Sequence, residues 1–219
     1  MATPLIKVCC IASLEEAHLA VRLGASALGL VSEMPSGPGV IDEARIHAIA
    51  AAIPLPTRTF LLTSKQDASS IVAQHERCGT TTIQLVDELD PAELRAIRRT
   101  LRSVELVQVI HVADESSIDE AVAVASNVDA ILLDSGSPSL AVKELGGTGR
   151  VRDWALSRRI RDAVHCPVYL AGGLTPNNVA TAIATVDPYG LDLCSGVRTD
   201  GRLDASKLIA FVEAARARA

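Results

Sequence analysis

The chain has few aromatic residues: one Trp, two Tyr and two Phe make up only 2% of its 219 residues. Proteins that bind single-stranded nucleic acid stack the bases on aromatic side chains, so this scarcity argues against that class. An excess of basic residues is also lacking, because 26 Asp and Glu outnumber 21 Lys and Arg and give a net charge of −5. Since sequence-independent binding to phosphate backbones needs a basic surface, we expect no nucleic-acid partner.

Long apolar runs are lacking as well. No run reaches the roughly 20 residues that span a membrane, and residues 1–7 show no signal-peptide pattern. We therefore expect no membrane partner and a cytoplasmic location. The five Cys are an odd number that fits no disulfide framework, and no Cys or His pairs stand at zinc-ligand spacing. We expect no metal.

What the chain does have is an apolar content of 48% and a regular alternation of short β-branched or Leu-rich runs with longer helical patterns. The expected strands are residues 6–10, 27–31, 57–62, 82–85, 105–111, 130–133, 168–171 and 191–193. The expected helices are residues 13–23, 42–53, 68–78, 90–102, 117–125, 153–164, 175–186 and 205–216. Ser13, with Glu16 three residues later, is typical of a helix capping box.

These eight strand–helix units are joined without any linker or change in composition. Repeated β–α units favour parallel strands with right-handed crossovers, and eight of them in this length predict a closed (β/α)8 TIM barrel, a single α/β domain over residues 1–219. The alternative is a doubly wound open sheet, whose dinucleotide-binding form needs a Gly-rich turn after the first strand. Residues 9–12, Cys-Cys-Ile-Ala, offer no such turn. In a barrel, chemistry belongs to the loops after the C-terminal ends of the strands.

Two glycine turns follow the last two expected strands. Gly172 and Gly173 lead into the sequence Leu-Thr-Pro, in which Thr175 is a plausible helix N-cap. Ser195 and Gly196 follow the next strand. Glycines let backbone N–H groups approach a ligand, and the loops after strands 7 and 8 often form a phosphate site in this fold. We therefore predict phosphate binding at these turns, against the alternative of plain tight turns.

A third glycine cluster, residues 146–149, ends a long Gly/Ser-rich stretch. Such a cluster is typical either of a loop that closes over a ligand or of a flexible connector, and the sequence alone does not choose between them.

Cys9 and Asp134 stand at the ends of the first and sixth expected strands. By strand alternation Lys7 and Cys9 share one face of their strand. A thiolate in positive surroundings is a competent base, and a carboxyl group in a dry site can act as an acid. Taken singly, Cys9 also fits a small buried residue and Asp134 a loop-capping carboxylate.

These residues, in this order, resemble the phosphoribosylanthranilate isomerase family of tryptophan biosynthesis over nearly the whole chain. The matching blocks are residues 7–9 (Lys-Val-Cys), 132–135 (Leu-Leu-Asp-Ser), 146–154 (from Gly-Gly-Thr-Gly to Asp-Trp), 170–179 (from Leu-Ala-Gly-Gly to Asn-Val) and 189–198 (from Tyr-Gly to Val-Arg). The resemblance implies an aldose–ketose isomerase that converts an aminoaldose to an aminoketose by an Amadori rearrangement, without cofactor or metal. Its partner is then a small phosphorylated substrate, and the chain is a monomer or a homodimer.

The resemblance also assigns roles to residues. It implies that Cys9 is the general base and Asp134 the general acid. It implies phosphate contacts by Gly147, Gly172, Gly173, Ser195 and Gly196, and further substrate contacts by Lys7 and Gln84.

The chain departs from the family pattern around the aromatic half of the substrate. The family's Arg that pairs with the anthranilate carboxylate is Pro38 here, and a His after the fourth strand is Val86. Pro cannot replace a bidentate Arg contact, so Arg150 or Arg198 is a candidate for a substitute cation. The blocks depart further at Cys10 for Gly and Cys194 for Ser.

Three functions stay open on these grounds. The first is phosphoribosylanthranilate isomerisation. The second is the same chemistry on another N-substituted phosphoribosyl amine, and the third is a sugar-phosphate binder without turnover. A histidine-pathway isomerase is less favoured, because that family uses two Asp whereas the first strand here ends in Cys9.

Overall fold

The computed structural model of the protein describes residues 3–35, 37–134 and 154–217. The predictions for residues 135–153, with Gly147 and Arg150 among them, lie outside this part of the chain. The strands are β1 (Leu5–Val8), β2 (Ala27–Val31), β3 (Arg58–Thr63), β4 (Thr82–Leu85), β5 (Glu105–His111), β6 (Ala130–Asp134), β7 (Val168–Ala171), β8 (Gly190–Leu193), β9 (Arg198–Thr199) and β10 (Arg202–Leu203). The helices are α1 (Leu14–Arg22), α2 (Glu43–Ala52), α3 (Ala68–Cys78), α4 (Pro91–Thr100), α5 (Ser116–Ala125), α6 (Trp154–Ala163), α7 (Val179–Val186), the short 3-10 helix η1 (Ser195–Val197) and α8 (Ala205–Arg216).

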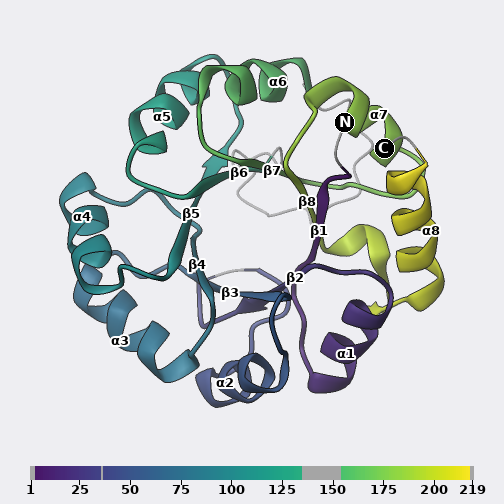
Figure 1. The fold of residues 1–219 in the computed structure, drawn as a ribbon, viewed down its shortest axis with the longest axis horizontal. Helices are drawn as coiled ribbons and strands as arrows, with labels where there is room; N and C mark the ends of the chain where they lie inside the picture. Colours follow the sequence, from purple (N-terminus) through teal and green to yellow (C-terminus); the bar gives the residue numbers. More distant parts are fainter. Residues whose placement is uncertain (1–2, 36, 135–153, 218–219) are drawn as a thin grey trace.

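Strands β1 to β8 close into a barrel in chain order, with β8 returning to pair with β1. The pairs around the barrel are parallel, and the helices surround it (Figure 1). The predicted (β/α)8 barrel is confirmed, and the open doubly wound sheet is excluded. In the register of β1, Lys7 stands opposite Ala27 of β2 and Asp192 of β8.

The start of α1 follows half of the predicted capping box. Ser13 is the N-cap, and its hydroxyl accepts a hydrogen bond of 3.2 Å from the backbone N–H of Glu16. In a full capping box the Glu16 carboxylate would accept from the N–H of Ser13. It instead accepts from the N–H of Ala12, at 3.1 Å. Glu16 therefore faces the loop after β1 rather than its own helix end.

Helix α7 begins later than predicted. The sequence indicates a start at Thr175, but the helix starts at Val179 with Asn178 as its N-cap residue. The Asn178 side chain folds back, accepting from the N–H of Thr175 at 2.8 Å and donating to the carbonyl of Gly173 at 3.1 Å. The prediction of Thr175 as N-cap is therefore wrong. The Asn178 side chain holds residues 173–175 in a turn after β7, and the helix begins only after this turn.

A small hairpin, β9 and β10, follows β8 and was not predicted. Its turn residues Asp200 and Gly201 have φ values of 49° and 77°. Positive φ at both central residues is the requirement of a type I′ turn, and Asp-Gly is a common sequence for it. The hairpin brings Arg198 and Leu203 back beside the loop after β1, where both contact Glu16.

The core has two layers because side chains alternate along each strand. One layer joins the strands to the helices and includes Val8 and Leu28. The other fills the barrel and includes Phe60, Leu132 and Tyr169. Cys9 belongs to this inner group, so its side chain lies on the barrel side of the strand end.

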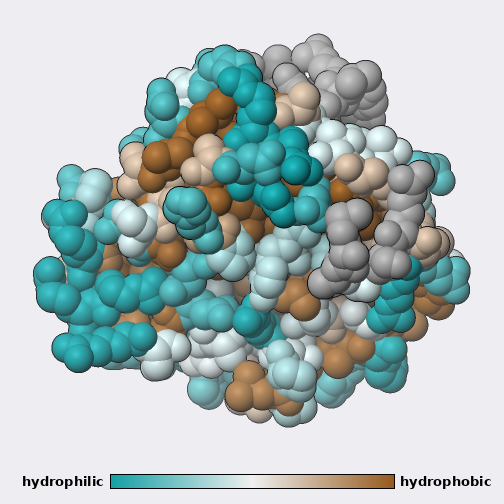
Figure 2. All heavy atoms as spheres, turned by 45° about the horizontal axis from the view of Figure 1, so that its top comes forward, coloured by the Kyte–Doolittle hydropathy of each residue, from teal (hydrophilic) through white to brown (hydrophobic). Residues whose placement is uncertain are grey.

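Hydrophilic residues cover most of the outer face seen in Figure 2, with apolar residues visible between them. Among the helices of the described residues, none has the length and apolar character needed to cross a membrane.

Candidate active site

The two predicted catalytic residues stand at the C-terminal mouth of the barrel. Cys9 directly follows β1, and Asp134 is the last residue of β6. Strands β7 and β8 separate them around the barrel wall, so the two side chains rise from different sides of the mouth. Cys9 is 7% exposed, and Asp134 is half-buried. A thiol and a carboxyl group thus stand at the same end of the barrel in two positions.

Gly29 of β2 makes room for Cys9. A Cβ atom placed on Gly29 would lie 2.7 Å from the Sγ of Cys9 and 3.2 Å from the Nζ of Lys7. Real Cβ atoms do not approach sulfur so closely, so only glycine leaves both groups in place. The structure therefore puts the Lys7 ammonium and the Cys9 thiol over the same face of β2, as strand alternation predicts.

Lys7 is held by an ion pair inside the barrel. Its Nζ lies 2.8 Å from Oδ2 of Asp192, and the two side chains are 0% and 8% exposed. The ammonium also stands 5.1 Å from the centroid of the Phe60 ring, at cation–π distance. Burial disfavours the charge, but Asp192 and then Cys9 outweigh it and raise the pKa of Lys7. Lys7 therefore stays charged beside Cys9.

Asp192 links this pair to the second predicted catalytic residue. Burial raises the pKa of Asp192, the charge of Lys7 opposes that shift, and the nearby carboxyl group of Asp134 adds to it. Electrostatic coupling therefore runs from Cys9 through Lys7 and Asp192 to Asp134. Sequence reasoning did not single out Asp192, although it lies in the block 189–198 that resembles the family and, by alternation, on the inner face of its strand.

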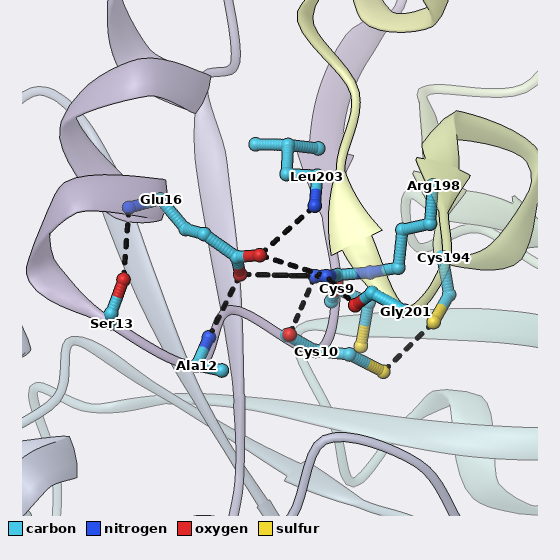
Figure 3. A network of polar contacts seen from close by, with 9 residues as sticks. All are labelled: Cys9, Cys10, Ala12, Ser13, Glu16, Cys194, Arg198, Gly201 and Leu203. Atoms are coloured by element: carbon cyan, nitrogen blue, oxygen red, sulfur yellow. Dashed lines mark hydrogen bonds and ion pairs between the residues drawn. The ribbon is translucent and has the colours of Figure 1, made fainter.

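Glu16 and Arg198 form a second, partly buried pair, which holds the loop after β1 (Figure 3). Their closest atoms are 3.1 Å apart, and the side chains are 9% and 17% exposed for Arg198 and Glu16. The Arg198 guanidinium also donates to the carbonyls of Cys9 and Cys10, at 3.1 and 2.6 Å. Burial opposes ionisation of Glu16, but donors from Leu203, Ala12 and Arg198 together lower its pKa.

These contacts bear on the prediction that Arg198 is a substitute cation for the substrate. Both terminal nitrogens of its guanidinium are engaged, by Glu16, by the carbonyls after β1 and by the carbonyl of Gly201 at 2.9 Å. A substrate role for Arg198 stays a prediction that this arrangement does not favour. The observed role of the side chain is to position the backbone that carries Cys9.

The two predicted phosphate turns lie against each other. A Cβ placed on Gly196 would lie 1.9 Å from the carbonyl oxygen of Leu174, so only glycine allows the loops after β7 and β8 to pack this closely. Gly172 and Gly173 have φ values of 91° and 49°, a region that favours glycine. Ser195 begins η1, one residue after the end of β8. The structure thus brings the four described residues of the predicted phosphate site to one side of the mouth.

The predicted substrate contact Gln84 and the positions that depart from the family pattern lie on β4 and in the loops after β2 and β4. Gln84 of β4 is buried, and its Oε1 has no hydrogen-bond partner among the described residues. Val86 packs on the inner group, whereas Asp87 and Pro38 are exposed. Within residues 3–35, 37–134 and 154–217, no group of three His, Cys, Asp or Glu is arranged to hold a metal ion.

A barrel of eight parallel strands that gathers a thiol, an ammonium and two carboxyl groups at its C-terminal mouth defines an enzyme of the (β/α)8-barrel class. Comparison with known proteins gives the family. The family model described as N-(5'phosphoribosyl)anthranilate (PRA) isomerase matches residues 6–214, and the chain belongs to this family. It is an isomerase of the aldose–ketose class.

Individual relatives agree with this assignment. The N-(5'-phosphoribosyl)anthranilate isomerase 2 of Methanosarcina mazei is 36% identical over 213 residues, which cover 96% of this chain and 93% of the relative. The crystal structure of phosphoribosyl anthranilate isomerase from Thermotoga maritima superposes with a TM-score of 0.84 at 27% identity, covering 98% of this chain and 99% of that one. A phosphoribosyl anthranilate isomerase in complex with reduced 1-(o-carboxyphenylamino)-1-deoxyribulose 5-phosphate gives a TM-score of 0.80 at 25% identity, with coverage of 98% and 99%.

Proposed function

We propose that the protein converts N-(5'-phosphoribosyl)anthranilate to its aminoketose by an Amadori rearrangement, with Asp134 as general acid and Cys9 as general base. The observation that carries the proposal is the placement of these two groups on different sides of one mouth, joined by the buried Lys7–Asp192 pair. Family membership supports the substrate class. A related structure binds a reduced carboxyphenylamino-deoxyribulose phosphate, a compound of this class.

The chemistry needs one proton donated and one removed. Asp134 protonates the ring oxygen of the ribose, the ring C–O bond breaks, and the nitrogen lone pair forms the Schiff base. Cys9, as thiolate, then takes the proton from C2, and the electron pair moves into the enolamine, which tautomerises to the ketose. Acid and base act on different atoms of the sugar, so two groups at separate positions around the mouth suit the reaction.

The wall around Cys9 and Asp134 supports these roles. Lys7 places a positive charge beside the sulfur that must become anionic to act as a base. Asp192 places a second carboxyl group, held by Lys7, near Asp134. Phosphate is proposed to bind the backbone of the glycine turns at Gly172, Gly173, Ser195 and Gly196. These turns follow β7 and β8, the two strands between Asp134 and Cys9, and Gly196 packs against Leu174.

A second candidate substrate is another N-substituted phosphoribosyl amine. It is favoured by Pro38, which is exposed where the family has its carboxylate-binding Arg, and by the engagement of Arg198 with Glu16. Loss of one charge-assisted contact costs about 1.5–3 kcal/mol, or roughly one to two decades in affinity. That loss weakens anthranilate binding without touching the acid and base.

The test is a fluorescence assay with freshly generated phosphoribosylanthranilate. We expect Cys9→Ala and Asp134→Asn each to lower kcat by about 10²–10⁴-fold, the range for one general acid or base. Cys166→Ala and Asp162→Asn are matched controls, because these residues lie before β7 and on α6, away from the mouth, and we expect them to keep wild-type kcat.

Unchanged kcat in Cys9→Ala would remove Cys9 as base, and the same result in Asp134→Asn would remove Asp134 as acid. A wild-type protein that ignores phosphoribosylanthranilate but isomerises another phosphoribosyl amine would select the second candidate. Binding of phosphate esters without any product would show a sugar-phosphate binder instead.

A further inference from the structure

Three of the five cysteines gather in the loops after β1 and β8 (Figure 3). The Sγ atoms of Cys10 and Cys194 are 2.9 Å apart, and Cys9 directly precedes Cys10 in the chain. The catalytic scheme proposed above uses Cys9 alone. The close pair of Cys10 and Cys194 therefore needs its own explanation.

The positions of this pair suit a disulfide. They follow neighbouring parallel strands, in which Val8 stands opposite Leu193 and the N–H of Cys9 donates to the carbonyl of Leu193 at 2.7 Å. The two sulfurs would have to approach by less than an ångström, from 2.9 Å to a bond of about 2.05 Å.

The alternative pair, Cys9 with Cys10, fits less well. Consecutive Cα atoms are only about 3.8 Å apart, which is below the usual disulfide range. Both Cys9 and Cys10 are also held through their carbonyls by Arg198, which limits rearrangement of the peptide between them. The geometry therefore selects Cys194, and not Cys9, as the partner of Cys10.

The charges around the pair divide the roles of its two thiols. The hydrogen bond with Cys10 lowers the pKa of Cys194, burial opposes this, and the charge of Arg198 adds to the lowering. Hydrogen bonds with Cys194 and Cys9, followed by burial, raise the pKa of Cys10. The thiolate is the form that reacts with oxidants, and Cys194 is half-buried whereas Cys10 is buried. Cys194 is therefore placed to attack and Cys10 to resolve.

We propose that Cys10 and Cys194 form a redox-active dithiol, a modification site at which hydrogen peroxide closes a reversible disulfide between two neighbouring loops at the mouth of the barrel. The Cys194 thiolate attacks one peroxide oxygen, the O–O bond breaks, hydroxide leaves, and Cys194 becomes a sulfenic acid. The Cys10 sulfur then attacks the Cys194 sulfur, the S–S bond forms, and the sulfenic oxygen leaves as water. Two thiols are oxidised and one peroxide is reduced to two waters.

The modification joins the loop after β1 to the loop after β8. It also touches the loop after β2, because a Cβ placed on Gly39 would lie 2.5 Å from the Cβ of Cys10. The proposal does not rest on the proposed function, since its product is a covalent bond that is mapped whether or not the protein turns over a substrate. A disulfide in a reducing compartment is transient, and such disulfides serve redox sensing.

The experiment exposes the reduced full-length chain to hydrogen peroxide and measures free thiols, intact mass and cross-linked peptides. We expect free thiols to fall from five to three, the mass to fall by two hydrogens, a Cys10–Cys194 cross-link to appear, and a dithiol reductant to reverse all three. Cys194→Ser should abolish the cross-link and slow thiol loss by at least about tenfold.

Two further variants and one control locate the bond. Cys10→Gly should also abolish it, and glycine suits the φ of 62° at this position, so this variant is expected to fold. Cys9→Ser and the control Cys166→Ser should both keep the cross-link. A Cys9–Cys10 cross-link, oxidation confined to Cys9, or five unreacted thiols would each overturn the proposal.

Discussion

The two ends of the barrel interior are filled by different kinds of side chain. At the N-terminal end, the Tyr169 ring stands edge-on to Phe60 at 5.9 Å and to Tyr189 at 5.5 Å. Arg58 caps it by donating to both tyrosine hydroxyls and by pairing with Glu105 at 3.2 Å. At the C-terminal mouth, the interior is filled by charges and thiols instead of rings. The N-terminal end is therefore closed by packed rings, whereas the C-terminal end carries the groups proposed for catalysis.

The ion pairs at the two ends show what this difference means energetically. The side chains of Arg58 and Glu105 are 31% and 40% exposed, whereas those of Lys7 and Asp192 are 0% and 8% exposed. Exposed pairs contribute about 0–1 kcal/mol. A buried pair must offset the desolvation of two ions, and an apolar pair of similar volume is often as stable. Stability alone does not account for Lys7 and Asp192, and their position beside Cys9 and Asp134 does.

The largest expected effect comes from breaking the buried pair. Lys7→Met leaves the Asp192 carboxylate without its partner inside the barrel, and we expect the free energy of unfolding to fall by about 3–5 kcal/mol at neutral pH. Chemical denaturation measures this loss. The matched variant Lys7→Met/Asp192→Asn removes the orphaned charge, so it should recover most of the stability while kcat stays low. Equal loss in both variants would contradict the assignment of the loss to an uncompensated carboxylate.

The same variant has a defined pH dependence. Burial already raises the pKa of Asp192, and removal of Lys7 takes away the charge that opposes this shift. A carboxyl group with a raised folded-state pKa binds its proton more tightly in the folded chain, so stability falls as pH rises from its ordinary pKa through the raised one. The difference between wild type and Lys7→Met should therefore be smallest at acid pH and grow toward neutral pH. A difference that grows on acidification would contradict this.

A pair of glycine substitutions gives the next largest effects and compares the two ends directly. An added Cβ meets Sγ of Cys9 at 2.7 Å in Gly29→Ala, and the ring of Tyr169 at 2.4 Å in Gly190→Ala. Displacing a reacting group by about 1 Å can cost about 10²-fold in rate, so we expect Gly29→Ala to lower kcat by about 10–100-fold. Overpacking costs about 1–3 kcal/mol, so Gly190→Ala should lose stability and keep kcat per folded molecule. The measurements are kcat and the denaturation midpoint of each variant. If both substitutions lower kcat equally, or both leave it unchanged, the functional difference between the two ends is contradicted.

The sequence predicted the strands and helices of the barrel, but it did not predict the polar contacts inside the barrel. Short β-branched or Leu-rich runs located the eight barrel strands, and strand alternation put Lys7 and Cys9 on one face. It did not pair Lys7 with Asp192, because that contact depends on the register between β1 and β8, which are 185 positions apart at this contact. Periodicity within one strand carries no information about such a register.

Local loop chemistry was the other gap. Asn178 turns back to Thr175 and delays α7, and Glu16 leaves its capping role for Arg198 on the distant hairpin. In both cases a polar side chain hydrogen-bonds to a group that helix-capping patterns in the sequence do not include. The Asp200–Gly201 turn was readable as a hairpin signal, and it would have located the arm that brings Arg198 to Cys9.

The smallest effect is expected at the closed end, from Tyr169→Phe. The lost hydroxyl accepts from Arg58 at 3.4 Å, a long hydrogen bond, so the loss of stability should be about 1 kcal/mol or less, and kcat should not change. Burial, ahead of the opposing charge of Arg58, raises the pKa of Tyr169 to about 12. Because the unfolded chain releases this proton near pH 10, wild-type stability should decline between about pH 10 and 12, and the variant should lack that part of the decline. Denaturation curves across this range test the prediction, and a fall in kcat in Tyr169→Phe would show that the closed end is coupled to the mouth after all.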